Sequence, residues 1–267
     1  MKNICSRYIL LIVLLTTSGF FYDAGAQKAR NFEIGWSFGV FRSKVQDNWD
    51  NSIIYGNSVF QPYRFHIKAK GGRWTHMLDY YYVKNKLQLL TGTALFSYNY
   101  VLSRSGELSY NAAYKIYQSE TSGFSLNTGL GVHAFGSARE RKTKSKRYPQ
   151  EDFIQAYDIN GGSLQLIINP EYRKNRNLYS FSVSAGVLNY VTRPDYYNPR
   201  FNYNNGKWEL VSLDKHFNLL GTLFYRYKIS ERFCADMEYR FFYYSYSFPY
   251  KLKVLNQNWF IGLSFKF

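Results

Sequence analysis

The last eleven residues read Gln257-Asn258-Trp259-Phe260-Ile261-Gly262-Leu263-Ser264-Phe265-Lys266-Phe267, with a large apolar residue at every second position. Side chains of a β-strand alternate between its two faces, so Trp259, Ile261, Leu263, Phe265 and Phe267 share one face. An apolar strand at the edge of a soluble sheet invites aggregation. A closed barrel in a membrane has no such edge. The stretch therefore predicts the closing strand of a membrane barrel.

The same stretch resembles the C-terminal signal of bacterial outer-membrane β-barrel proteins, whose pattern is polar, any, Gly, any, any, apolar, any, aromatic. Gly262, Phe265 and Phe267 match it, and Phe260 stands where the family usually has a polar residue. The resemblance implies an all-β fold, a transmembrane antiparallel up-and-down β-barrel in the bacterial outer membrane. It also implies assembly by the barrel-insertion machinery, with outer-membrane lipid and lipopolysaccharide as surroundings. It identifies no functional residue.

The other end of the chain predicts a signal peptide over residues 1–26, which leaves an outer-membrane β-barrel domain over 27–267. Lys2 and Arg7 precede an apolar run at 8–15, and the small-x-small site Ala24-Gly25-Ala26 follows. The apolar run is too short for a transmembrane helix, which needs about 20 residues. Cys234 is then the only cysteine of the mature chain, so no intramolecular disulfide is expected.

The composition favours a barrel over a helical membrane protein. Mean hydropathy is −0.39, yet aromatic residues make up 20%, with 27 Tyr and 22 Phe. Barrels combine these properties because apolar lipid-facing positions alternate with polar lumen positions, and aromatic girdles lie at both interfaces. In a soluble protein, the formal net charge of +16 would suggest a nucleic-acid partner. At the predicted location in the outer membrane, no nucleic-acid partner is expected.

Period-two alternation divides the chain into strands of about ten residues, the length that a tilted membrane strand needs. They are expected at 32–40, 61–70, 73–84, 87–102, 106–118, 123–136, 163–173, 178–191, 215–229, 232–246 and 257–267. Bacterial barrels have even strand numbers, so a further strand is expected between 48 and 60. About twelve strands result, with ten as the alternative if 61–84 is less regular. Short periplasmic turns are expected at 173–177 and 230–231, and outer loops at 137–162, 192–214 and 247–256.

The inward positions are the best sequence guide to function. Several predicted strands place small residues there, which would leave space in the lumen. Others place long basic residues there, and these form a predicted lumen basic track: Arg64, Lys68, Lys70, Arg226, Lys228 and Arg240. Asp236 and Glu238 are predicted ion-pair partners, with Arg226 opposite Asp236 if the turn at 230–231 is tight. The track either conducts small anionic solutes or pairs across the lumen and holds the wall together.

A basic patch is predicted on the outer loop at 137–162. It consists of Arg139, Arg141, Lys142, Lys144, Lys146 and Arg147. At this location the phosphates of lipopolysaccharide or an acidic polysaccharide are the expected partners, and a solvated loop without a ligand is the alternative.

Catalytic chemistry is not expected from the histidines. Outer-membrane lipases and lipid A deacylases carry His-x-Ser on a strand, and none of His66, His76, His133 and His216 is followed by this spacing. His133 with Ser137, and His76 with Asp79 as in omptin-like proteases, are the pairs that could still approach. No metal site and no cofactor are expected.

Three functions are considered. The one that the sequence favours is a passive porin-like channel for small hydrophilic solutes with a mild anion preference. The second is a closed barrel whose basic outer loop binds surface polymer or a secretion partner. The third is a lipid-modifying hydrolase.

Overall fold

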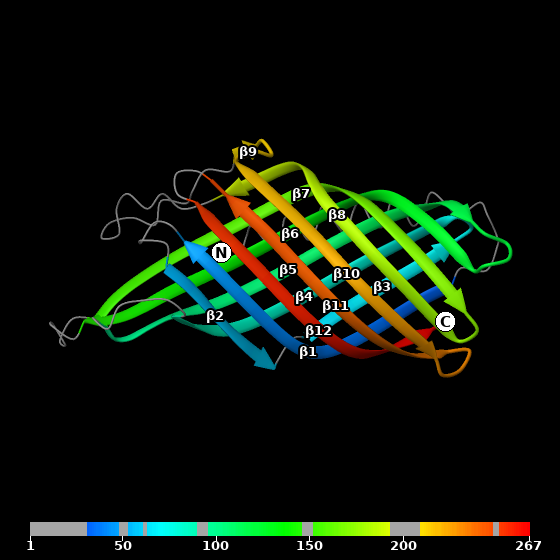
Figure 1. Cartoon of the computed structure of the whole chain (residues 1–267), viewed down its shortest axis with the longest axis horizontal. Coiled ribbons are helices and arrows are strands. Elements are labelled where there is room, and N and C mark those ends of the chain that lie inside the picture. The colour runs from blue at the N-terminus through cyan, green and yellow to red at the C-terminus, as the bar shows by residue number, and fades with distance from the viewer. Residues whose placement is uncertain are drawn as a thin grey trace.

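The computed structural model describes residues 31–47, 53–60, 63–89, 96–145, 152–192, 209–247 and 251–267, and the predicted signal peptide lies outside these ranges. They form one antiparallel sheet of twelve strands (Figure 1). The strands are β1 (Asn31–Asp47), β2 (Ile53–Phe60), β3 (Tyr63–Gly71), β4 (Trp74–Leu89), β5 (Phe96–Gln118), β6 (Phe124–Ser145), β7 (Asp152–Lys174), β8 (Asn177–Thr192), β9 (Glu209–Val211), β10 (His216–Lys228), β11 (Phe233–Tyr246) and β12 (Leu252–Lys266).

The sheet closes on itself through its first and last strands. β12 pairs with β1 from Glu33 opposite Lys266 to Asp47 opposite Leu252, and with β11 on its other side. The amide of Phe267 also donates to the carbonyl of Phe32, at 2.9 Å. The C-terminal stretch is thus the closing strand, and the antiparallel barrel predicted from it is confirmed.

The twelve strands occupy ten positions around the barrel, because two positions are each shared by two strands. β2 pairs with residues 40–47 of β1, and β3 pairs with residues 31–37 of the same strand. Both run antiparallel to β1, so together they fill one strand position of the barrel. β9 and β10 share the position beside β8 in the same way. The strand expected between 48 and 60 is therefore present as β2, and it shares its position in the barrel with β3.

The two ends of the barrel differ. At one end, here called the turn end, short connections at 72–73, 119–123, 175–176 and 229–232 join neighbouring strands. Gly72 and Gly123 adopt positive φ there, as does Asn175, which are conformations that Gly and Asn adopt most readily. At the other end, the loop end, β5, β6 and β7 run to 22–23 residues each and extend beyond the other strands (Figure 1).

Three strand boundaries predicted from the sequence are wrong. Residues 85–86 and 103–105, which fall between expected strands, lie within β4 and β5, and residues 87–102 are not one strand. Residues 137–162, expected to be an outer loop, lie mainly in β6 and β7. The predicted turns at 173–177 and 230–231 are confirmed.

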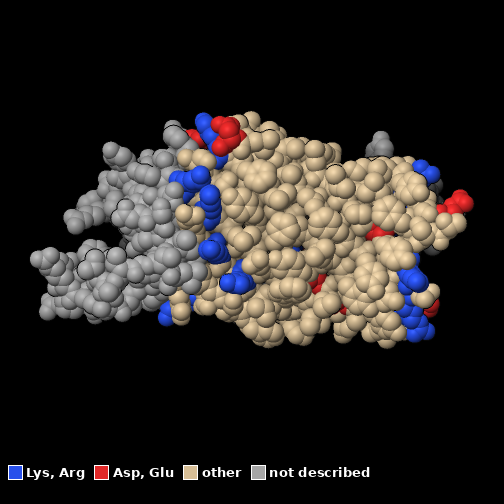
Figure 2. Space-filling view, viewed as in Figure 1, with Lys and Arg blue, Asp and Glu red and all other residues tan. Residues whose placement is uncertain are grey.

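The outward face carries a belt of exposed apolar side chains. Trp36, Trp259, Ile261 and Leu263 are 57–60% exposed, and the belt continues around the barrel. Figure 2 shows a surface with few charged atoms between two bands of charged residues, one at each end. A belt of this kind between polar rims is what an integral barrel presents to a bilayer. No helix in the described part of the chain is long and apolar enough to cross a membrane.

Candidate functional site

The middle of the lumen holds a network of buried charges on Arg64 of β3, Asp79 of β4 and Arg240 of β11. Arg64 Nε and Arg240 Nη1 donate to the two oxygens of Asp79, at 2.8 and 2.7 Å. The network then branches to Glu238, 2.7 Å from Arg64 Nη1, and to Glu107, 2.9 Å from Arg240 Nη2. All five residues are at most 5% exposed. One bridging carboxylate therefore joins two guanidinium groups across the barrel.

A second buried group lies nearer the turn end and centres on Arg226 of β10. Its guanidinium donates to both oxygens of Glu33, each at 2.6 Å, and to both oxygens of Asp236, at 2.6 and 2.8 Å. Ser264 hydroxyl hydrogen-bonds Asp236 and accepts from Arg226 at 3.0 Å. Arg226 lies directly opposite Asp236 in the β10–β11 ladder. The pairing predicted from the tight turn is confirmed.

Glu33, His66 and Asp236 bring three possible metal ligands within 4.8 Å of one another. The Arg226 guanidinium, however, already bonds both carboxylates, and His66 Nε2 is 3.4 Å from Glu33. The guanidinium of Arg226 thus supplies, between these carboxylates, the positive charge that a metal ion would otherwise supply. The residues do not favour a metal site.

On the loop-end side of these charges, the lumen is filled with apolar and aromatic side chains. Phe135, Phe242 and Tyr244 contact one another with ring centroids 5.1–5.6 Å apart. They belong to a buried cluster whose other members are Val45, Leu87, Val191, Val211, Leu220, Tyr246, Leu252 and Val254. We call this cluster the lumen plug.

The small inward residues do not open the lumen where their neighbours are described. A Cβ added to Gly35 would collide with the His66 ring, and one added to Gly186 would meet the amides of Asn218 and Asn189. Likewise, Phe135 covers Gly161. Small residues on one strand make room for large side chains of another, because close packing fills the interior.

The predicted basic track is therefore divided. Arg64, Arg226 and Arg240 are buried and paired with carboxylates, as the alternative of cross-lumen pairing proposes. Lys70 lies 3.9 Å from Glu171 near the turn end, with its side chain 33% exposed. Lys228 lies at the turn itself, where its ammonium donates to Glu231 at 2.6 Å. That hydrogen bond lowers the pKa of the Glu231 carboxyl below its usual value.

The histidine pairs considered from the sequence are not brought together. His76 faces outward and contacts the Tyr110 hydroxyl at 2.8 Å, whereas Asp79 faces the lumen, because positions three apart on a strand lie on opposite faces. His133 is fully buried, 3.6 Å from Glu107, while the Ser137 hydroxyl contacts Ser105.

Sequence reasoning missed the central role of Asp79. It shares the period-two face of Tyr81 and Val83, both of which are buried. Alternation along β4 was the signal that would have placed its carboxylate in the lumen beside Arg64.

The predicted outer-loop basic patch falls on the extension of β6. Arg139, Arg141, Lys142 and Lys144 lie within this strand, where Arg139 is paired with Tyr157 and Arg141 with Gln155 of β7. Their prediction as loop residues is wrong, because the two strands continue past the barrel. Lys146 and Arg147 lie outside the described residues.

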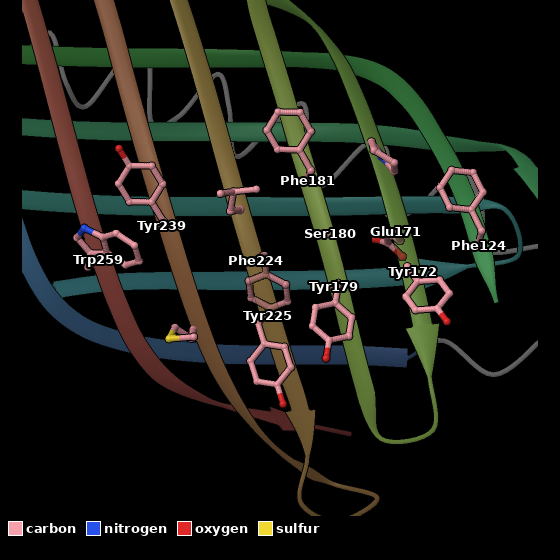
Figure 3. Close-up of a pocket in the computed structure, with 13 residues that line it drawn as sticks. Phe124, Glu171, Tyr172, Tyr179, Ser180, Phe181, Phe224, Tyr225, Tyr239 and Trp259 are labelled. Atoms are coloured by element: carbon pink, nitrogen blue, oxygen red, sulfur yellow. The ribbon is translucent and has the colours of Figure 1, made fainter. Parts of the chain in front are cut away.

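A groove of about 430 Å³ lies on the lipid-facing side of β7, β8, β10, β11 and β12. Figure 3 shows aromatic rings along it, among them Tyr179, Tyr225, Phe181 and Trp259. Pro170 borders the groove. The β7–β8 ladder has pairs at Ile168 and Glu171 but none at the two residues between them. Proline has no amide hydrogen to donate there.

No family model matches the chain, and no curated protein matches it. Among solved structures, it is similar to the outer-membrane protease OmpT from Escherichia coli, with a TM-score of 0.55, 9% identity, and coverage of 89% of this chain and 96% of that one. It is also matched to the translocator domain of the autotransporter NalP from Neisseria meningitidis, with a TM-score of 0.46, 10% identity and 98% coverage of both chains. At these identities the likeness concerns the fold. The chain has the fold of bacterial outer-membrane β-barrel proteins, and its apolar belt is that of an integral outer-membrane barrel.

Proposed function

We propose that this protein is a closed outer-membrane barrel that presents basic residues on its outer extension to anionic polymer outside the cell. The outer extension is the part of β5, β6 and β7 formed by residues 96–101, 138–145 and 152–159. The observation that carries the proposal is the paired lumen, in which Arg64, Arg226 and Arg240 are 2–6% exposed and bound to carboxylates.

A conducting lumen requires a continuous path of water and mobile charge. Here each of the three lumen arginines is bound to carboxylates, and the lumen plug lies against this layer, since the ring of His133, beside Glu107, has its centroid 4.8 Å from that of Phe242. These contacts favour the closed barrel over a passive channel. Breaking such a layer is costly, because an unpaired charge would stay buried.

The outer extension supports the binding role. Short turns lie at the periplasmic side in bacterial barrels, so the loop end faces the exterior, and the extension projects from it. Arg139 and Arg141 share one face of β6, and Lys142 and Lys144 share the other. Cations on both faces of a strand attract the phosphate or sulfate groups of a polyanion.

Two measurements on the refolded mature protein test this function. In a planar bilayer with a salt gradient, we expect no discrete conductance steps. Binding to heparin, used as a sulfated polysaccharide probe, should weaken at least tenfold in the variant R139Q/R141Q/K142Q/K144Q. A variant with equal charge loss at the turn end, K174Q/R176Q/K228Q/R232Q, should bind as the parent does.

Discrete steps whose reversal potential moves in K68Q/K70Q would contradict the closed barrel and establish the anion channel. Equal heparin binding by the two quadruple variants would leave the extension without the proposed role.

A further inference from the structure

Among the described residues, the outward face of β1, β4, β5 and β12 carries basic residues just beyond the apolar belt. On β1, Arg42 and Lys44 follow Val40 on the same face, and all three are exposed. Lys84 on β4, Arg104 on β5 and Lys253 on β12 face the same way. We call these five residues the basic rim.

The strands of the basic rim lie close together, with β2, which carries no basic residue, between β1 and β4. β12 pairs with β1, and β2 joins β1 to β4, which pairs with β5. Lys84 lies directly opposite Arg104 in the β4–β5 ladder. Two like charges at opposed positions destabilise a sheet, so an anion between them would stabilise it.

No acidic side chain described on these strands can neutralise the rim. Glu33, Asp79 and Glu107 all face the lumen, are at most 5% exposed, and are bound to arginine. Within the described part of the chain, the five rim residues form no ion pair with any carboxylate.

The depth of the rim identifies its partner. Val40 is paired with Trp259 and Phe60, and Arg42, two residues further, with Gln257 and Ser58. Two residues of a strand span about 7 Å, so the cations begin one step beyond the hydrocarbon belt. Side chains at this level face the headgroups of the outer leaflet, where long basic side chains reach phosphates.

The described outward positions of β8 and β11 carry no basic residue at this level. At the corresponding level, the exposed outward residues of β8 are Leu188 and Tyr190, and Tyr243 holds the equivalent place on β11. A general preference for basic residues at an interface would distribute them around the whole barrel. Lys215 is an exposed cation before β10, but the gathering of five basic residues on β12, β1, β4 and β5 indicates a site.

We propose that the basic rim binds the phosphate groups of a phosphorylated glycolipid of the outer leaflet, with the sugar above Lys84 and Arg104 and the acyl chains along the apolar face of β12, β1 and β4. This site is separate from the outer extension, and it holds whether or not the proposed function does.

The test uses the refolded mature protein in phospholipid nanodiscs, with purified diphosphorylated lipid A as probe. We expect saturable binding that weakens at least tenfold in K44Q/K84Q/R104Q. The control K174Q/R176Q/R232Q removes the same charge from the turn end and should bind as the parent does. Heat-modifiable migration on a gel verifies that both variants are folded.

Two further arms define the ligand. Lipid A stripped of its phosphates should bind at least tenfold more weakly, and millimolar inorganic phosphate should not displace the lipid. The outer-extension variant R139Q/R141Q/K142Q/K144Q should keep its lipid A affinity. Equal affinity of the rim variant and its control, or full binding of the dephosphorylated lipid, would overturn the proposal.

Discussion

At the scale of single residues, Asp79 organises the lumen. Its two oxygens bind Arg64 and Arg240, and each of these arginines reaches one further carboxylate. A buried ion pair contributes little net stability compared with well-packed apolar residues. Replacing only one partner of such a pair is strongly destabilising, because the remaining charge stays buried without a partner in a medium that solvates it poorly.

We therefore expect Asp79→Asn to lower the free energy of unfolding by about 3–5 kcal/mol. Urea unfolding of the barrel in lipid vesicles, followed by tryptophan fluorescence, measures the change. Glu231→Gln serves as the control, since Glu231 pairs with Lys228 on the exposed turn, and its unfolding curve should overlay the parent. Overlapping curves for Asp79→Asn and the parent would show that Asp79 is not the centre of the network.

At the scale of the strands, the seam between β1 and β12 decides whether the barrel closes. Gly262 lies opposite Ser37 in this seam, and a Cβ at Gly262 would collide with the carbonyl of Trp36 and with Ser37. Backbone cannot move aside as a flexible side chain can, so the strands would have to separate.

Gly262→Val is expected to prevent closure, and the unheated protein should lose the compact form that migrates faster than the heated one on a gel. Leu263→Val changes the neighbouring outward residue, which is 60% exposed, and should leave that form intact. A compact Gly262→Val barrel would mean that the seam tolerates a side chain there. Gly262 was identified from the sequence as part of the assembly signal, and the seam gives it a local steric role as well.

The sequence predicts best the parts of strands that stay within the membrane belt, such as residues 32–40 of β1 and 257–266 of β12. There, apolar residues face out and polar residues face in. Along β4 the pattern reverses, because Lys84 faces out while Val83 and Leu87 are buried in the lumen. In the part of the barrel beyond the apolar belt, outward side chains face water and inward side chains pack in the lumen plug. The polar residues at 85–86 and 103–105, which fall between expected strands, are therefore strand residues outside the belt.

The candidate site was harder to predict than the wall. Alternation placed Arg64, Arg226 and Arg240 in the lumen correctly, and a tight turn predicted the Arg226 and Asp236 pair. Contacts across the lumen, such as Arg64 with Glu238, join residues 174 positions apart. Period and turn chemistry carry no information on such pairs. The same limit explains why Gly35 suggested open space when His66 covers it.

At the scale of the whole molecule, the apolar belt sets the depth of the barrel in the bilayer. Ile261 lies within the belt at 60% exposure, whereas Ser58 is exposed at the level of Arg42. A lysine facing lipid costs most at the bilayer midplane and little near the interface.

Ile261→Lys should lower the free energy of unfolding by about 2–4 kcal/mol, and Ser58→Lys by about 0–1 kcal/mol. Urea unfolding midpoints in phospholipid vesicles compare the two directly. Equal costs would place both residues at one depth and contradict the proposed position of the basic rim.

The length of β6 has a consequence for how a polyanion would be recognised. About eight residues separate Ser137 at the end of the lumen from Ser145 at the end of the strand, which at about 3.3 Å per residue and a tilt of about 40° lifts the tip some 20 Å. The ionic atmosphere above a charged membrane decays over about 8 Å at physiological salt. Lys144, next to the end of β6, therefore lies at a height where the charge of the cell's own leaflet is screened, so that this leaflet would not compete with a polymer arriving from outside.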